Sequence, residues 1–303
     1  MELLQIDLAE LQALKERLYR EPGYMGVVLL PWTFKLLDGP IMDRWTLLSM
    51  GRRRPWVIVG QLGMVLSSLV LAAAPDPFGQ IALLMALGFA VNFFAAFQDV
   101  AVDGMAIEIV PENEQARANG FMWGGKMLGI AGAAAGGAWM LNSYGLGPTM
   151  VTHAALVGLV MLVPLLLRER PGERVLPWTA GEASAEAAAM QLEGWRSIVA
   201  SLLRAIRMPA TLVLLGIAFA HGLVNGLFEA TMPLLTVREL GWTDSAYSQL
   251  AGSARIISGV LGMVLGGVLV DRIGRRAGMT VTLLAMGAGA LVMALLPSLW
   301  PSL

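Results

Sequence analysis

The stretch GGVLVDRIGRR, residues 266–276, joins an apolar segment to four charged side chains. The fifteen residues before its aspartate carry no charge at all. A looser copy of the pattern lies far upstream in the chain. The glycine and aspartate of that copy precede their counterparts by the same 228 residues, Gly39 before Gly267 and Asp43 before Asp271. The repeat predicts two matched structural segments within one chain.

The composition around these segments is that of a membrane protein. The chain has 303 residues, of which 56% are hydrophobic and 14% charged, whereas a soluble domain carries about 25% charged residues. Apolar runs of about 20 residues, the length that crosses a bilayer as a helix, recur along most of the sequence. We therefore predict an all-α, polytopic transmembrane helical bundle.

Eight membrane spans are predicted from these runs, with boundaries uncertain by a few residues. They lie at about 24–42, 55–74, 79–108, 117–141, 149–167, 209–235, 247–270 and 278–297. Alternate connections contain fourteen arginines, and the opposite connections contain one, Arg238. The positive-inside rule places the arginine-rich loops in the cytoplasm.

The spans divide the chain into four parts. Residues 1–23 form an amphipathic N-terminal segment, which either lies on the membrane surface or is a packed or frayed extension. Residues 24–168 hold five spans, residues 169–208 a cytoplasmic linker with an amphipathic helix, and residues 209–303 three further spans. We expect the first five spans to be an N-terminal half and the last three to be part of a C-terminal half.

Together the motifs resemble one transporter family. GGVLVDRIGRR is similar to the cytoplasmic loop signature of the major facilitator superfamily, which occurs after its second helix and again after its eighth. The blocks PWTFKLLDGPIMDRW, GRRRPW and QDVAVDG resemble the muropeptide-permease and acetyl-coenzyme A transporter branch. The first copy departs from the signature by the extra residues WTLLSM.

The resemblance implies a twelve-helix fold built from two six-helix repeats. Aligned by the motif, the eight spans correspond to helices two through nine, and helix one and helices ten to twelve are absent. A fragment of a longer gene and a reduced variant both fit this alignment, and a fragment is the simpler account.

The motif residues form the first set of candidate site residues. Each glycine lets a neighbouring helix approach closely, the aspartates can accept hydrogen bonds from a helix N-terminus, and the arginines can pair with acids. Arginines at a cytoplasmic helix end also occur as ordinary topology signals. The candidate gate residues are Gly39, Asp43, Arg44, Gly51, Arg52 and Arg53 in the first copy and Gly267, Asp271, Arg272, Gly274, Arg275 and Arg276 in the second.

Charged and polar residues inside the spans form the second set, because a charge in a bilayer is costly and indicates function. Lys35 and Asp103 each lie about 12 Å from the cytoplasmic end of a span, and Asp99 and Lys126 lie deeper. We predict the pairs Lys35–Asp103, Lys126–Asp99 and Glu229–Arg255. Either these pairs hold helices together permanently, or an acid changes partner or protonation during transport.

Two polar faces accompany these charges. Asn92 shares a helix face with Asp99 and Asp103, and His221, Asn225 and Glu229 recur every four residues on another span. The second face either lines a cavity that binds a polar ligand or packs against a neighbouring helix.

No enzyme signature accompanies them. The chain has two histidines and no cysteine, and it lacks a metal-ligand cluster and the phosphate-binding loop that ATP hydrolysis requires. We predict no enzymatic activity, no cofactor, no metal and no nucleic-acid partner.

The sequence thus predicts a secondary active transporter of a polar organic solute in the bacterial inner membrane. Its partners would be the solute, protons carried by symport, and the lipid bilayer, and its oligomeric state is left open. The branch resemblance implies a muropeptide or a coenzyme A thioester as solute. The alternative is a truncated or non-transporting membrane protein that at most assembles with another chain. A membrane-embedded enzyme lacks a convincing nucleophile and base.

Overall fold

A computed structural model describes residues 23–75, 79–191 and 194–295 of the chain. The regular structure of these residues is helical and includes no strand, as predicted. The predicted amphipathic segment at residues 1–23 lies outside the described residues except for its last position.

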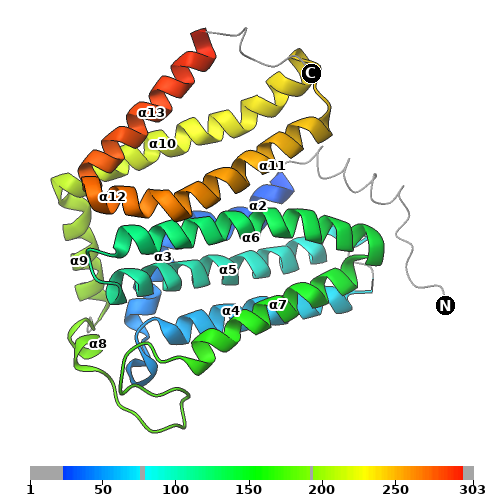
Figure 1. Cartoon of the computed structure of the whole chain (residues 1–303). Coiled ribbons are helices and arrows are strands. Elements are labelled where there is room, and N and C mark those ends of the chain that lie inside the picture. Colours follow the sequence, from blue (N-terminus) through cyan, green and yellow to red (C-terminus); the bar gives the residue numbers. More distant parts are fainter. Residues whose placement is uncertain (1–22, 76–78, 192–193, 296–303) are drawn as a thin grey trace. The chain divides into compact units, whose positions relative to one another are not determined.

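The helices follow one another through short connections, apart from the segment between α7 and α8 (Figure 1). Short 3₁₀ and π segments are labelled η. The elements are α2 (Gly23–Thr33), α3 (Lys35–Arg44), η1 (Leu48–Met50), α4 (Arg54–Ala73), α5 (Ile81–Ile109), α6 (Gln115–Tyr144), α7 (Leu146–Leu166), α8 (Ala185–Ala189), α9 (Trp195–Arg207), α10 (Pro209–Pro233), η2 (Leu234–Glu239), α11 (Asp244–Leu261), η3 (Gly262–Gly266), α12 (Gly267–Ile273) and α13 (Arg275–Leu295).

Among the described residues, five helical segments are long and apolar enough to cross a membrane. They are Arg54–Ala73, Ile81–Ile109, Leu146–Leu166, Pro209–Glu239 and Ala246–Ile273. Each coincides with one of the eight predicted spans. The other three predicted spans correspond to α2 with α3, to α6 and to α13, and their placement in the membrane stays a prediction.

The first predicted span, 24–42, is two helices rather than one. The N–H groups of Phe34 and Leu37 donate to carbonyls three residues back, at 3.1 and 2.8 Å, instead of continuing the α-helical pattern. Pro31 lies inside α2, and Pro40 lies inside α3. A proline inside a helix removes a backbone donor and clashes with the preceding turn. The break therefore falls between two prolines, directly before Lys35.

The helix ends follow ordinary rules of capping. α4 and α10 each begin with a proline in the first turn, where its missing N–H is not needed. Gly145 separates α6 from α7 with a φ of 81°, a value that favours glycine. The Thr243 hydroxyl accepts from the Ala246 N–H at 3.2 Å at the start of α11, which satisfies one free donor of that helix.

The described part of the chain forms two compact units. Unit 1 contains the described residues of Met1–Ile109 and Gly136–Ser201. In it α4 packs along both α5 and α7, and α2 and α3 pack on α5. The buried residues Met42, Val57, Phe97 and Ala101 form its apolar cluster.

Glycines and one polar pair allow the close packing of α4 in unit 1. A Cβ at Gly60 would lie 2.8 Å from the Cβ of Gln98 on α5, so these helices touch through the glycine. On the side toward α7, Ser68 Oγ and His153 Nδ1 are 2.9 Å apart. The Ser68 hydroxyl and one ring nitrogen of His153 are thus paired in an apolar setting.

Unit 2 contains Val110–Ala135 and the described residues of Leu202–Leu303. Here the first half of α6 packs against α11 and α12 through glycines. A Cβ at Gly124 would lie 2.9 Å from the Gly259 carbonyl, and one at Gly259 would lie 2.7 Å from the Met127 Cβ. The glycine repeat of this span thus permits backbone contact, as small residues do between membrane helices.

Candidate functional site: an ion-pair network and a charged path

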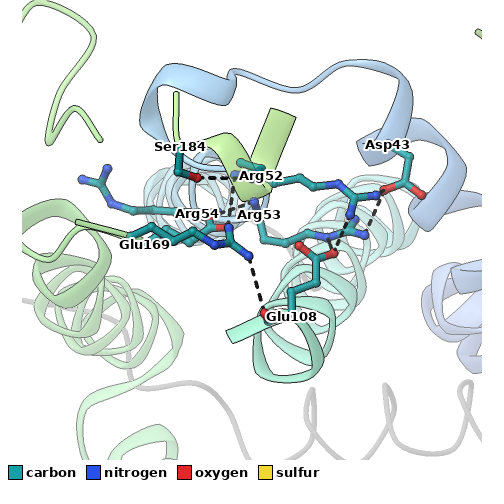
Figure 2. Close-up of polar contacts among 9 residues, drawn as sticks. Asp43, Arg52, Arg53, Arg54, Glu108, Glu169 and Ser184 are labelled. Carbon is teal, nitrogen blue, oxygen red and sulfur yellow. Dashed lines mark hydrogen bonds and ion pairs between the residues drawn. The ribbon is translucent and has the colours of Figure 1, made fainter. Parts of the chain in front are cut away.

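Two arginines and two acids of unit 1 form a buried square at the end of α3. Arg52 donates to Asp43 Oδ1 at 2.7 Å, and Arg53 forms an ion pair with the same oxygen at 2.9 Å; both arginines donate to Glu108 Oε1, at 3.1 and 2.9 Å. Figure 2 shows the two guanidinium groups lying between the two carboxylates. The residues come from α3, the following loop and the end of α5. The network therefore fixes the first motif copy to α5.

Gly51 and Gly104 make room for this square. Gly51 has a φ of 104°, and a Cβ there would run into Glu169. A Cβ at Gly104 would lie 3.0 Å from Arg53 Nε. Gly104 ends the QDVAVDG block, so the site accounts for one glycine that the branch resemblance singled out.

The carboxylate of Glu169 lies at the start of α4. It accepts the backbone N–H groups of Arg52, Arg53 and Arg54 at 3.1, 2.9 and 2.7 Å. Its side chain is fully buried and also pairs with Arg170 at 3.1 Å. The first N–H groups of a helix lack partners within the helix and carry partial positive charge, so a buried carboxylate is well placed there.

Arg54 has the complementary role at the end of α7, where its cationic side chain meets free carbonyl groups. Its guanidinium donates to the carbonyls of Pro164 and Leu165, in the last turn of that helix, and to those of Met50, Arg174 and Val175. The residue is 1% exposed. A cation at a helix C-terminus satisfies free carbonyls and complements the helix dipole. Arg54 thus joins the start of α4 to the end of α7.

Glu173 extends the network into the segment after α7. It accepts the Arg170 N–H at 3.0 Å and the Ser184 hydroxyl at 2.8 Å, and it is fully buried. Four carboxylates and four arginines thus balance in charge: Asp43, Glu108, Glu169 and Glu173 with Arg52, Arg53, Arg54 and Arg170.

The sequence analysis missed the acids of this network. Glu108, Glu169 and Glu173 were not among the predicted site residues, because they lie far from the motif along the chain. The alternating charges of RERPGER, residues 168–174, are the signal that indicates a paired cluster. Of the predicted motif residues, Arg44 is exposed at the end of α3.

The second motif copy is more open. In unit 2, Asp271 lies 3.6 Å from Arg117, whose side chain is 51% exposed. Arg275 lies 3.4 Å from Glu112 and also donates to its backbone carbonyl. Gly274 has a φ of 84°, matching the left-handed backbone of Gly51. Arg272 and Arg276 are exposed.

Gly267 permits the closest backbone approach of this copy. A Cβ at Gly267 would lie 2.5 Å from the Arg117 Cα. The corresponding Gly39 of the first copy has no atom within 4 Å of the same position. Close helix approach is therefore a property of the second glycine and is absent at the first.

Lys35 pairs with Asp99, which was not its predicted partner, and the predicted pairing with Asp103 stays a prediction. The ammonium contacts Asp99 Oδ2 and lies 5.1 Å from the centre of the Trp32 ring. The Trp32 Nε1–H donates to Asn92 Oδ1 at 2.9 Å. The break before Lys35 ends α2 and sets the register of α3 against α5, which the even spacing along one continuous helix did not anticipate. Lys35, Trp32, Asn92 and Asp99 thus form a polar path along one face of α5.

The predicted pairing of Lys126 with Asp99 connects residues of different units and stays a prediction. Within unit 2 the Lys126 ammonium lies 5.1 Å from the centre of the Trp123 ring. Asp103 lies one turn after Asp99 on α5. The roles of both residues in transport stay predictions.

The predicted pair Glu229–Arg255 is present. A guanidinium nitrogen of Arg255 on α11 lies 3.3 Å from Glu229 Oε1 on α10. His221 and Asn225 lie on one face of α10, as predicted, and their side chains contact at 2.8 Å. An i, i+4 pair on a helix meets in this way. Asn225 also donates to the His221 carbonyl at 3.0 Å, so the stripe is partly satisfied within its own helix.

Within the described ranges, no group of three or more His, Asp or Glu side chains could hold a metal ion. The paired carboxylates, lysine and arginines are groups that can exchange protons and ion-pair partners. Carboxylates paired with a lysine or with arginines can change partner when they gain or lose a proton.

Comparison with known proteins places these sites in context. Anhydromuropeptide permease of Escherichia coli K12 is 22% identical over 251 residues, which cover 83% of this chain and 48% of the permease. The permease of strain O157:H7 matches to the same extent. An uncharacterized protein of Haemophilus influenzae is 29% identical over 92 residues, 30% of this chain and 21% of that protein.

The chain thus spans about half the length of the permeases it matches. No solved structure matches it. The names of these relatives point to a transporter rather than an enzyme. Residues 24–303 match the Major Facilitator Superfamily, which confirms the resemblance seen in the repeated motif. The chain belongs to this superfamily and is a multi-pass integral protein of the bacterial inner membrane.

Proposed function

We propose that the chain transports a polar organic solute across the membrane by alternating access, coupled to protons. The observation that carries the proposal is the pair of Lys35 with Asp99 beside the break between α2 and α3. An ion pair within a membrane span is costly and marks a transport path by default. Interrupted helices line such paths in many transporters.

Protonation of Asp99 provides the coupling step. The attraction between the Lys35 ammonium and the Asp99 carboxylate holds α3 against α5. When Asp99 takes up a proton, the attraction is lost and Lys35 is released. The Trp32 ring lies within reach of the ammonium and gives the released cation a second favourable contact. A proton thus changes which element holds Lys35, and with it the fit between α3 and α5.

The polar path suits a solute with amide, hydroxyl and carboxylate groups. Trp32 provides an aromatic face, Asn92 an amide and Lys35 a cation. Such groups recognise sugars and short peptides, and two relatives are named anhydromuropeptide permeases. We propose a muropeptide as the solute for this reason.

The network at Asp43 is the proposed brace of the cytoplasmic gate in unit 1, and Asp271 holds the corresponding place in unit 2. Among the described residues, Arg52 Nε and Glu108 Oε2 are buried without a hydrogen-bond partner. Unsatisfied buried groups favour rearrangement, which supports a network that is remade during the transport cycle.

The test is solute uptake into proteoliposomes, with a pH gradient and anhydromuropeptides. Asp99→Asn is expected to abolish gradient-driven uptake while leaving solute exchange without a gradient. No uptake by well-folded wild-type protein would overturn the proposed transport, and gradient-driven uptake by Asp99→Asn at the wild-type rate would overturn the coupling.

A double variant separates coupling from a purely structural pair. Lys35→Gln with Asp99→Asn removes both charges and leaves no uncompensated ion, so thermal stability should recover relative to either single variant. If the pair only holds helices together, the double variant should also recover gradient-driven uptake. We expect it to recover stability alone.

A further inference from the structure

Helix α9 has two apolar surfaces rather than one. At about 100° per residue, its six large apolar side chains span an arc of about 140°. Ile198, at one edge of the arc, is buried against the protein. Val199 and Leu203, at the other edge, are 48% and 46% exposed, and Trp195, near the middle of the arc, is 45% exposed. The first edge therefore attaches the helix to the protein, and the second faces away from it.

The arginines of α9 border the exposed edge. On the same projection Arg196, Arg207 and Arg204 lie within about 100° of Leu203, on the side away from Ile198. The helix contains no acidic residue, and all three arginines are exposed. None of them forms an ion pair with a carboxylate of the described residues.

We propose that α9 is a binding surface for anionic phospholipids. Trp195, Val199 and Leu203 enter the boundary between headgroups and acyl chains, and the three arginines contact headgroup phosphates. An amphipathic helix with aromatic and aliphatic groups on one side and arginines beside them lies in the plane of such an interface. Anionic lipids attract each basic residue near the surface by about 1 kcal/mol. The proposal does not depend on what the chain transports.

The location of α9 makes the lipid contact consequential. Trp195 packs edge-on against Trp45, which follows α3, with 5.6 Å between ring centres. At its other end a single residue, Met208, separates α9 from α10. A lipid surface that holds α9 therefore restrains the chain at the start of α10 and at the end of α3.

The absence of cysteine from the chain allows specific labelling of the full protein. Val199→Cys, on the exposed edge, and Ser201→Cys, on the opposite side of α9, would each carry a nitroxide. The labelled proteins are reconstituted in phosphatidylcholine with or without phosphatidylglycerol. Phosphatidylglycerol should move the label at 199 deeper, so that oxygen relaxes it more and a water-soluble relaxant less. The label at 201 should remain accessible to water.

The arginines are tested in the same assay. Arg204→Gln with Arg207→Gln should weaken the response to phosphatidylglycerol by roughly fivefold for each arginine. The matched control, Arg168→Gln with Arg238→Gln, removes the same charge outside α9 and should leave the response intact. Thermal unfolding confirms that each variant is folded.

Three results would overturn the proposal. A label at 199 that phosphatidylglycerol does not move excludes an anionic-lipid surface. An unchanged response in the Arg204→Gln, Arg207→Gln variant assigns the effect to another part of the chain. A label at 199 that is shielded from both relaxants in either lipid places a protein partner, and not lipid, on this edge.

Discussion

The two copies of the charged motif use the same residue types and differ in how tightly those residues are held. Asp43 Oδ1 lies 2.7 and 2.9 Å from the guanidinium nitrogens of two buried arginines, Arg52 and Arg53. Asp271 reaches one arginine, half exposed, at 3.6 Å. The turn glycines Gly51 and Gly274 share a left-handed backbone, with φ of 104° and 84°. The two glycines thus share a backbone conformation, and their surroundings differ.

The difference lies in the acids that each unit brings to the motif. In unit 1 the end of α5 and the segment after α7 contribute Glu108 and Glu169, which are 11% and 0% exposed at the side chain. In unit 2 Arg275 pairs with Glu112, which is 86% exposed. Solvent screens an exposed pair and leaves it worth little, whereas breaking a buried one is costly. We infer that the first copy is a firm brace and the second a weak latch.

The largest expected effect comes from removing the acid that distinguishes unit 1. Glu169→Ala leaves three N–H groups of α4 and the Arg170 charge without their buried partner, and should destabilise unit 1 by about 3–5 kcal/mol. The thermal unfolding midpoint of the purified protein measures this. Glu182→Gln, at an exposed acid of the same segment, is the control, and an equal loss in both would contradict the assignment.

Matched aspartate variants test the comparison directly. Asp43→Asn should cost about 1.5–3 kcal/mol, because it weakens one hydrogen bond between charged groups and one further ion pair. Asp271→Asn should cost about 0–1 kcal/mol, the range of exposed ion pairs. Both are compared by thermal unfolding midpoints in the same detergent. Equal shifts would show that the two copies are energetically equivalent.

Asp271→Asn also tests the proposed gate. We expect slower exchange between inward-facing and outward-facing states with unchanged solute affinity, measured by solute binding and by the rate of counterflow. An equal loss of affinity would contradict a gating role.

Alanine substitutions at the motif glycines should give the opposite order, with the larger loss of stability in the second copy. Gly267→Ala places a methyl group 2.5 Å from the Arg117 Cα, and such overpacking costs about 1–3 kcal/mol. Gly39→Ala meets no atom within 4 Å and should gain up to about 1 kcal/mol of helix propensity in α3. Thermal unfolding of the two variants should give shifts of opposite sign. Destabilisation by Gly39→Ala would show that α3 is packed more tightly than described.

The smallest expected effect is the influence of salt on the stability that a variant of each motif copy loses. Raising ionic strength shortens the Debye length and screens exposed charge pairs more than buried ones, so Arg275→Gln should lose less stability at high salt than at low salt. Arg52→Gln should cost about the same at both, since its partners are buried. Unfolding midpoints in low-salt and high-salt detergent solution provide the measurement, and a strong salt dependence for Arg52→Gln would count against a buried network.

The sequence analysis anticipated much of this molecule from local pattern. Apolar run lengths predicted the helices, and the repeat predicted two matched segments, in which Gly51 and Gly274 share a positive φ. The pair of Glu229 with Arg255 followed from similar depth on adjacent spans. The contact of Lys35 with Asp99 did not follow, because it depends on the break between Pro31 and Pro40, which sets the register of α3 against α5.

By itself the sequence determined the membrane location, the helical class, the family and the residues able to carry charge in the membrane. These properties depend on composition and on spacing along the chain, which the sequence records directly. Only the tertiary structure decided which charges meet. Glu169 and Arg54 lie 115 residues apart in the chain, and the carboxylate is within 2.7 Å of the Arg54 N–H. Such pairs depend on helix register and on the path of the segment after α7, where small shifts decide whether a charge is buried and matched.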